Sequence, residues 1–169
     1  KMKYPREVWA GSHIKNAPQM KRKIVKTKSE YVNFIKVQNN RTNVYTTVYD
    51  FGLFAETAKV DSSVIIDRIF FDFDAHEDEL ESALNDLKIV LEYVSKYQHT
   101  IFFSGRGFHL FVFGKQVDNI RGIQAYFREV KEYLDSKVGN ENSLDERVGQ
   151  VTRLRRVPNT VNLASDNGN

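Results

Sequence analysis

Cysteine is absent from this chain, and histidine and proline are scarce. Without thiols there can be neither disulfides nor thiolate zinc sites, and four scattered histidines argue against an all-imidazole metal site. Three prolines are too few to mark a hinge between domains. Any metal bound here is therefore expected to have oxygen ligands, which suit hard cations.

Long apolar runs are also missing. No stretch approaches the ~20 apolar residues of a membrane-spanning helix, and the opening residues KMKYPREVW lack the pattern of a signal peptide. We therefore expect a cytoplasmic protein without membrane contact. The 169 residues, 41% of them hydrophobic, suffice for one domain with an ordinary core, which we divide into a basic lobe (1–60) and a second lobe (61–169).

Acidic residues are few in the first lobe. Residues 1–60 hold 12 Lys/Arg and 4 Asp/Glu (+8), whereas residues 61–169 hold 13 and 18 (−5). Such a split is typical of a chain whose first part contacts a polyanion and whose second part holds a cation, although a charge run is more often only a solvated face. The candidates for contacts with a phosphate backbone are Lys15, Lys21, Arg22, Lys23, Lys26 and Lys28.

Asp72 and Asp74 interrupt the apolar end of the segment VIIDRIFFDFD at residues 64–74. Its β-branched and aromatic residues predict a strand, whose period of two puts Asp72 and Asp74 on one face, roughly 7 Å apart. Two carboxylates that close repel each other unless a cation lies between them. Asp74 could instead cap a following helix, because residues 74–77 fit a capping box, but Asp72 has no such explanation.

From residue 61 the pattern reads strand, helix, strand, strand, helix, strand. Apolar residues three and four apart predict the helices, with Leu80, Leu84, Leu87, Leu91 and Val94 on the buried face of the first. The strands are 64–74, TIFFS, FHLFVFG across a GRG link, and VTRLRRVP. This order predicts an α+β, ferredoxin-like (RRM-like) βαββαβ fold, with both helices on one face of an antiparallel sheet. Strand 64–74 would lie between FHLFVFG and the last strand.

Two kinds of protein use the open face of such a sheet. RNA-recognition modules stack bases on it, and RGFHLFVF resembles their consensus. However, His109 replaces a small residue, Leu110 occupies a stacking position, and two carboxylates would repel a phosphate backbone. The alternative is the palm of a nucleotidyl transferase, in which carboxylates hold two divalent ions. It needs a third acid, for which Asp145 is the candidate.

A nucleotidyl transferase also has to hold phosphates. The SGRGFH turn offers backbone N–H groups together with Ser104, Arg106 and His109. The last strand adds Arg155 and Arg156, which alternate and so point to opposite faces.

With DFD, SGRGFH and LDERV…TRLRRVPNTVN in this order, the chain resembles the archaeo-eukaryotic primase superfamily, especially the catalytic small subunit of archaeal primase and plasmid primase-polymerases. The resemblance implies that Asp72, Asp74 and Asp145 are catalytic ligands of two Mg²⁺ or Mn²⁺ ions. It implies contacts to the incoming nucleotide from Ser104, Arg106, His109 and Arg156, with Arg155 as the rival of Arg156. The early YPREVW resembles another family segment, which would bring Arg6 and Glu7 near the site.

The function implied by this resemblance is that of a DNA primase or primase-polymerase core, which makes primers on single-stranded DNA from NTPs or dNTPs. A repair polymerase of the same superfamily, filling gaps or joining ends, would have the same site. A non-catalytic RNA-binding module remains the third reading. The family implies further partners: a second domain or accessory subunit, and a helicase or replisome component of archaeal, plasmid or viral replication machinery.

Overall fold

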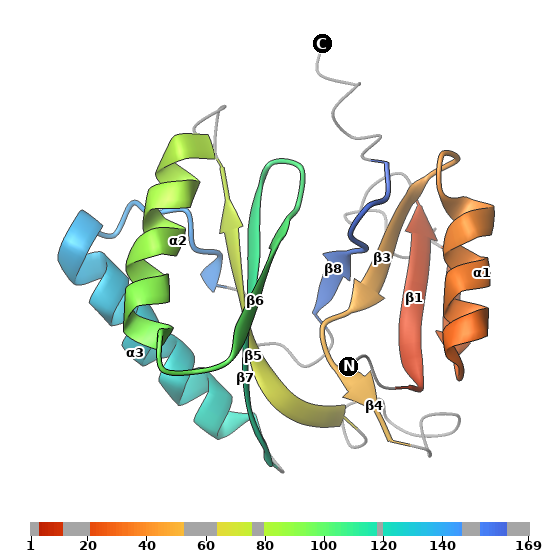
Figure 1. Ribbon diagram of the computed structural model, residues 1–169, viewed down its shortest axis with the longest axis horizontal. Coiled ribbons are helices and arrows are strands. Elements are labelled where there is room, and N and C mark those ends of the chain that lie inside the picture. The colour runs from red at the N-terminus through yellow and green to blue at the C-terminus, as the bar shows by residue number, and fades with distance from the viewer. Residues whose placement is uncertain are drawn as a thin grey trace. The chain divides into compact units, whose positions relative to one another are not determined.

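The computed structural model describes residues 4–11, 21–52, 64–75, 80–117, 120–146 and 153–161. These fall into two compact units, an N-terminal unit (1–65 with 151–169) and a central unit (66–150). In chain order the elements are β1 Arg6–Gly11, β2 Lys21–Val25, α1 Lys28–Gln38, β3 Asn43–Thr47, β4 Asp50–Phe51, β5 Val64–Asp74, α2 Leu80–Val94, β6 His99–Phe103, β7 Gly107–Val117, α3 Arg121–Val138 and β8 Leu154–Arg156 (Figure 1). Both sheets are antiparallel, as expected for an α+β chain.

The N-terminal unit is a sheet in the order β2-β1-β3-β8 with α1 packed on one face (Figure 1). Helix α1 begins after Thr27, whose hydroxyl accepts a hydrogen bond from the Glu30 N–H, a side-chain cap that satisfies one of the free donors of the first turn. Its buried residues Tyr31 and Phe34 pack against valines from the strands. Segment 43–51 forms β3 and the short β4.

Arg6 forms a buried ion pair inside this unit. Its guanidinium lies 3.0 Å from the Asp50 carboxylate and donates a hydrogen bond of 2.8 Å to the Thr47 carbonyl. Both charged side chains are at most 1% exposed. Removing one partner of such a pair leaves the other charge buried in a medium that solvates it poorly.

We expect Arg6→Met to lower the free energy of unfolding by about 3–5 kcal/mol, because Asp50 would keep its charge without its guanidinium. Urea unfolding of the full chain measures this. The matched control is Arg41→Met, since Arg41 is exposed just after α1 and its loss should change stability by less than about 0.5 kcal/mol. Equal effects of the two substitutions would contradict a structural role for the pair.

The central unit is built on the strand order β5-β7-β6, with α2 and α3 on the same face (Figure 1). Phe71 of β5 stacks on Phe127 of α3 with ring centroids 5.4 Å apart, and Phe71 lies opposite Leu110 of β7. Residues 71, 73 and 110 therefore face the helices, while the alternate residues line the other face. The predicted pairing of the acid-bearing strand with FHLFVFG is confirmed.

The prediction for the last strand is wrong. Strand β8 pairs with β3 in the N-terminal unit, with Tyr45 opposite Arg156, and not with β5. The edge of β5 away from β7 is instead met by β4, at Val64 and Ile65, and by one bridge between Phe73 and Leu144. Strand propensity predicts that a segment is extended but carries no information on which free sheet edge the segment joins.

The buried stripe of α2 is turned relative to the prediction. It consists of Ala83, Asp86, Leu87, Val90 and Val94, whereas Leu80 is 39% exposed. In α3 the predicted Phe127, Val130 and Leu134 are buried. Within the part of the chain that the structure describes, no helix has both the length and the apolar character to cross a membrane.

Candidate metal centre

Asp72, Asp74 and Asp145 come together in the central unit. Each offers a carboxylate oxygen, and these oxygens all lie within 4.8 Å of one another. Asp72 is buried, and the other two are partly exposed, so the cluster can be reached from solvent. Three carboxylates at this separation repel one another strongly unless a cation lies among them. The donor set is all oxygen, which fits Mg²⁺ or Mn²⁺.

The strand geometry of β5 explains why two of these acids converge. Asp72 and Asp74 alternate with the helix-facing phenylalanines and so share the face without helices. Asp74 is the last residue of β5 and pairs with Gly107. Because Asp74 pairs with Gly107 as part of the strand and its carboxylate lies with those of Asp72 and Asp145, its place is better explained by the acid cluster than by a helix cap.

Asp145 reaches the cluster from the short segment after α3. Its N–H donates a hydrogen bond of 2.8 Å to the Asp72 carbonyl, and the Asp74 N–H donates one of 2.8 Å to the Ser143 carbonyl. The segment therefore follows the outer edge of β5 in antiparallel fashion for three residues, around the Phe73–Leu144 bridge. This places the third acid beside the first two, although by a different connection from the one predicted.

The SGRG turn lies at the same end of β5. Gly105 has φ +101°, a backbone conformation that residues other than glycine rarely adopt. At Gly107 an added Cβ would lie 1.9 Å from the Phe73 carbonyl oxygen, so only glycine allows β7 to approach β5 here. The Ser104 N–H donates to the Gly107 carbonyl, and the Ala75 N–H to the Arg106 carbonyl. The turn is thus fixed beside Asp74, with Arg106 exposed and Ser104 partly exposed.

His109 lies opposite Asp72 in the β5–β7 register. Its Nε2 is 3.4 Å from the Asp72 Oδ1, and its ring meets Phe70 edge-on with centroids 5.2 Å apart. The residue is 5% exposed. Buried Phe70 and Phe111 exclude water on this side of Asp72, which strengthens any charge interaction there. The predicted phosphate contact of His109 stays a prediction.

Arg155 and Arg156 point to opposite faces of the sheet in the N-terminal unit. Arg155 is 7% exposed and lies opposite Thr46, on the α1 face near Tyr31. Arg156 lies on the other face, with its guanidinium 5.8 Å from the centre of the Tyr45 ring. Arg156 is therefore the better candidate for a contact with a ligand. Since the acid cluster belongs to the other unit, its triphosphate role stays a prediction.

A row of cations and aromatic rings crosses this sheet and was not predicted. Arg22, Trp9, Tyr45 and Arg156 are consecutive partners across β2, β1, β3 and β8. The Arg22 guanidinium lies 5.3 Å from the Trp9 ring centre, and it also forms an ion pair with Glu7. Trp9 is partly exposed, whereas Tyr45 is 7% exposed. Along β1, Glu7, Trp9 and Gly11 alternate with the apolar Val8 and Ala10, and this pattern could have indicated that Trp9 lies on the face opposite the core.

The predicted phosphate-contact segment is described from Lys21 onward, and Lys15 lies outside the described residues. Lys21 and Lys23 are exposed on β2 and lie opposite Ala10 and Val8, so they alternate with Arg22. Lys26 and Lys28 are exposed around the start of α1. These cations therefore do not share one face. Arg6 and Glu7, expected near the site from the resemblance, form ion pairs with Asp50 and Arg22.

The residues that resembled an RNA-recognition consensus face the wrong way for that function. Phe108 and Leu110 lie opposite Phe73 and Phe71, on the helix-covered face, and Leu110 is fully buried. Base-stacking residues of RNA-recognition modules need the open face of the sheet. The open face here carries Asp72 and its neighbours instead.

No family model and no curated protein sequence matches the chain. The fold is similar to that of a solved polymerase domain, and this likeness supports the sequence resemblance at the level of the fold. The polymerase domain of ligase D from Mycobacterium tuberculosis, solved in complex with DNA, superposes with a TM-score of 0.63 at 12% identity, over 93% of this chain and 69% of that domain.

A second solved structure, the primase-polymerase AEP domain of cyanophage S-2L, gives a TM-score of 0.48 at 13% identity, over 94% of this chain and 82% of that one. The fold assignment rests on the first of the two. At such identities the likeness concerns the fold alone, so the chemistry has to be argued from the acid cluster.

Proposed function

We propose that this chain is a divalent-metal-dependent nucleotidyl transferase that copies a single-stranded DNA template, as a primase or primase-polymerase core. The observation that carries the proposal is the convergence of three carboxylates on the open face of a polymerase-type fold. An acid cluster alone is common on protein surfaces. Here one member, Asp72, is buried beside aromatic rings, where the repulsion among three carboxylates this close together is poorly screened by water.

In the proposed mechanism Asp72, Asp74 and Asp145 hold two Mg²⁺ or Mn²⁺ ions. When bound, such ions activate the attacking 3′-hydroxyl and stabilise the charge that develops on the leaving pyrophosphate. The three carboxylates would hold the ions, and buried Phe70 and Phe111 exclude water from the Asp72 side. His109 supports this arrangement through its contact with Asp72.

The incoming nucleotide would be held by its phosphates. The SGRG turn is placed beside Asp74 and supplies the Ser104 hydroxyl and the exposed Arg106 guanidinium. A guanidinium binds two phosphate oxygens at once, which orients the group as well as attracting it. For a further phosphate contact we prefer Arg156 to Arg155, because Arg155 is buried on the α1 face of its sheet.

The template would contact the N-terminal unit. Exposed Lys21, Lys23, Lys26 and Lys28 suit phosphates, and Trp9 beside Arg22 offers a ring on which a base can stack. The ligase D domain that is similar in fold was solved with DNA, which favours DNA over RNA as the template. The same likeness makes a repair polymerase the second candidate.

The experiment is incorporation of labelled nucleotides on single-stranded DNA, with and without a primer, in Mg²⁺, in Mn²⁺ and in EDTA. We expect extension that requires a divalent ion and stops in EDTA. Products made without a primer identify a primase, and products made only from primed or gapped DNA identify the repair alternative. RNA binding in EDTA without incorporation under any condition would contradict the proposal and favour the RNA-binding reading.

A further inference from the structure

The segment that carries Asp145 is short and has little support from the sheet. Among its described residues, up to Glu146, it pairs with β5 through residues 143–145, by the two backbone hydrogen bonds of 2.8 Å that flank the Phe73–Leu144 bridge. It is not part of a regular strand. A metal-binding side chain on such a segment is poorly fixed in position unless a second element holds the segment. Asp72 and Asp74, in contrast, are fixed by β5 itself.

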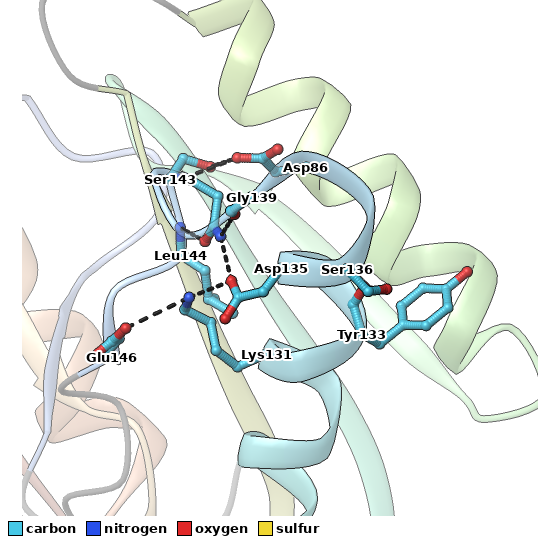
Figure 2. A network of polar contacts seen from close by, with 10 residues as sticks. Asp86, Lys131, Tyr133, Asp135, Ser136, Gly139, Ser143, Leu144 and Glu146 are labelled. Carbon is cyan, nitrogen blue, oxygen red and sulfur yellow. Dashed lines mark hydrogen bonds and ion pairs between the residues drawn. The ribbon is translucent and has the colours of Figure 1, made fainter.

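The second support comes from a buried acid on α2. Asp86 is 3% exposed, and its Oδ2 accepts hydrogen bonds from the Ser143 N–H (2.8 Å) and the Ser143 hydroxyl (2.7 Å) (Figure 2). The carbonyl of the same serine accepts from the Asp74 N–H. Ser143 is therefore held between a helix and a strand that both lie far from it in the sequence.

Other contacts of the loop are weaker supports. Asn142 donates to the Asp135 carboxylate and to the Gly139 carbonyl, which closes the loop on the end of α3. Lys131 reaches Glu146 at 3.5 Å, but Glu146 is 75% exposed, and an ion pair with such a partner is screened by water. The double contact of Asp86 is buried and charge-assisted, so it holds the segment more firmly.

Burying Asp86 in the apolar stripe of α2 is costly for folding alone. Its neighbours in that stripe are Ala83, Leu87, Val90 and Val94, and an apolar residue at position 86 would pack among them without desolvating a charge. An acid at this core position is explained by its contact with the loop, which it holds in place. Asp145 is the member of the acid cluster that lies on this loop.

We propose that Asp86 is a positioning residue of the metal centre: through Ser143 it fixes the segment that presents Asp145 to Asp72 and Asp74. The inference rests on the proposed metal site. Binding sites need their ligands held within about 0.5 Å, and partners that orient metal ligands typically change metal affinity 10–100-fold when they are replaced. Asp86 contacts Ser143 and not a metal-binding carboxylate directly. We therefore expect its replacement to change metal affinity by a factor near the lower end of that range.

The test is Mn²⁺ affinity of the full chain without nucleotide, measured by calorimetry or by the EPR signal of free Mn²⁺. We expect Asp86→Asn to weaken binding about tenfold, because the amide oxygen that replaces Oδ2 carries no charge and accepts the two bonds of Ser143 more weakly. Ser143→Ala, which removes one of the two bonds, should weaken binding by a smaller factor. Glu92→Gln, on the exposed side of α2, should bind as wild type does.

A merely structural role is separated by Val90→Ala, which shortens a fully buried side chain of the same helix stripe. It should lower the unfolding temperature without changing Mn²⁺ affinity well below that temperature. If wild type binds Mn²⁺ and Asp72→Asn does not, but Asp86→Asn binds as wild type does, the inference is overturned and the metal site stands. If wild type binds no Mn²⁺, both fall. Should Asp86→Asn fail to fold, unchanged affinity in Ser143→Ala overturns the inference.

Discussion

Asp72→Asn is expected to reduce metal-dependent nucleotide incorporation about a thousandfold or more. Asp72 is the buried member of the acid cluster, and it is held beside His109 and Phe70. Metal ions in such sites contribute several kcal/mol to stabilising the transition state, and each 1.36 kcal/mol lost is a factor of ten in rate. The measurement is the initial rate of primer extension in saturating Mg²⁺ and Mn²⁺.

The same variant separates catalysis from folding. In EDTA, Asp72→Asn should be at least as stable as wild type, because one of three mutually repelling carboxylates becomes neutral. The matched control is Glu92→Gln, which neutralises an exposed acid on α2 and should keep full activity. Wild-type extension rates in a folded Asp72→Asn protein would rule out the carboxylate as a metal ligand.

Gly107→Ala is expected to impair both folding and the acid cluster. Its Cβ would lie 1.9 Å from the carbonyl oxygen of Phe73 and 3.2 Å from the Cα of Asp74. Because these are backbone atoms, β5 and β7 would have to separate at the end that carries the acid cluster. We expect a loss of about 3 kcal/mol in the free energy of unfolding, at the upper end of the range for overpacking, together with loss of Mn²⁺ binding.

A second glycine of the same strand is the control. An alanine Cβ at Gly114 would meet nothing within 4 Å, so Gly114→Ala should leave stability and Mn²⁺ affinity nearly unchanged. Urea unfolding and Mn²⁺ binding of the two variants measure the difference. Similar behaviour of both would show that the close approach of β7 to Phe73 is not required.

The elements of the central unit could be predicted because local pattern determines them. Helix periodicity indicated α3, and the β-rich run indicated β5 with Asp72 and Asp74 on one face. The pairing of β8 could not be predicted, because Leu154–Arg156 is extended in either sheet and only tertiary packing selects β3. The buried face of α2 was misjudged because its leucines outweighed the smaller Ala83 and Val90.

The site residues that belong to a sequence motif could be predicted, whereas the residue that acts through tertiary packing was missed. Asp72, Asp74 and Asp145 were named from motif order, and the structure brings their oxygens within 4.8 Å. Asp86 was missed, although an acid in the series of Ala83, Leu87 and Val90 is an anomaly that helix spacing could have exposed. The partner of that acid, Ser143, is 57 residues away, and a sequence pattern does not reveal such a contact.

The central claim is that Asp72, Asp74 and Asp145 together bind divalent metal. The most direct measurement is anomalous diffraction at the manganese edge from crystals of this chain grown with Mn²⁺ and a non-hydrolysable nucleotide. The predicted result is anomalous density within coordination distance of all three carboxylates, with the nucleotide's phosphates on its other side. Well-ordered nucleotide with Mn²⁺ bound by other residues, and none at these three, would contradict the account.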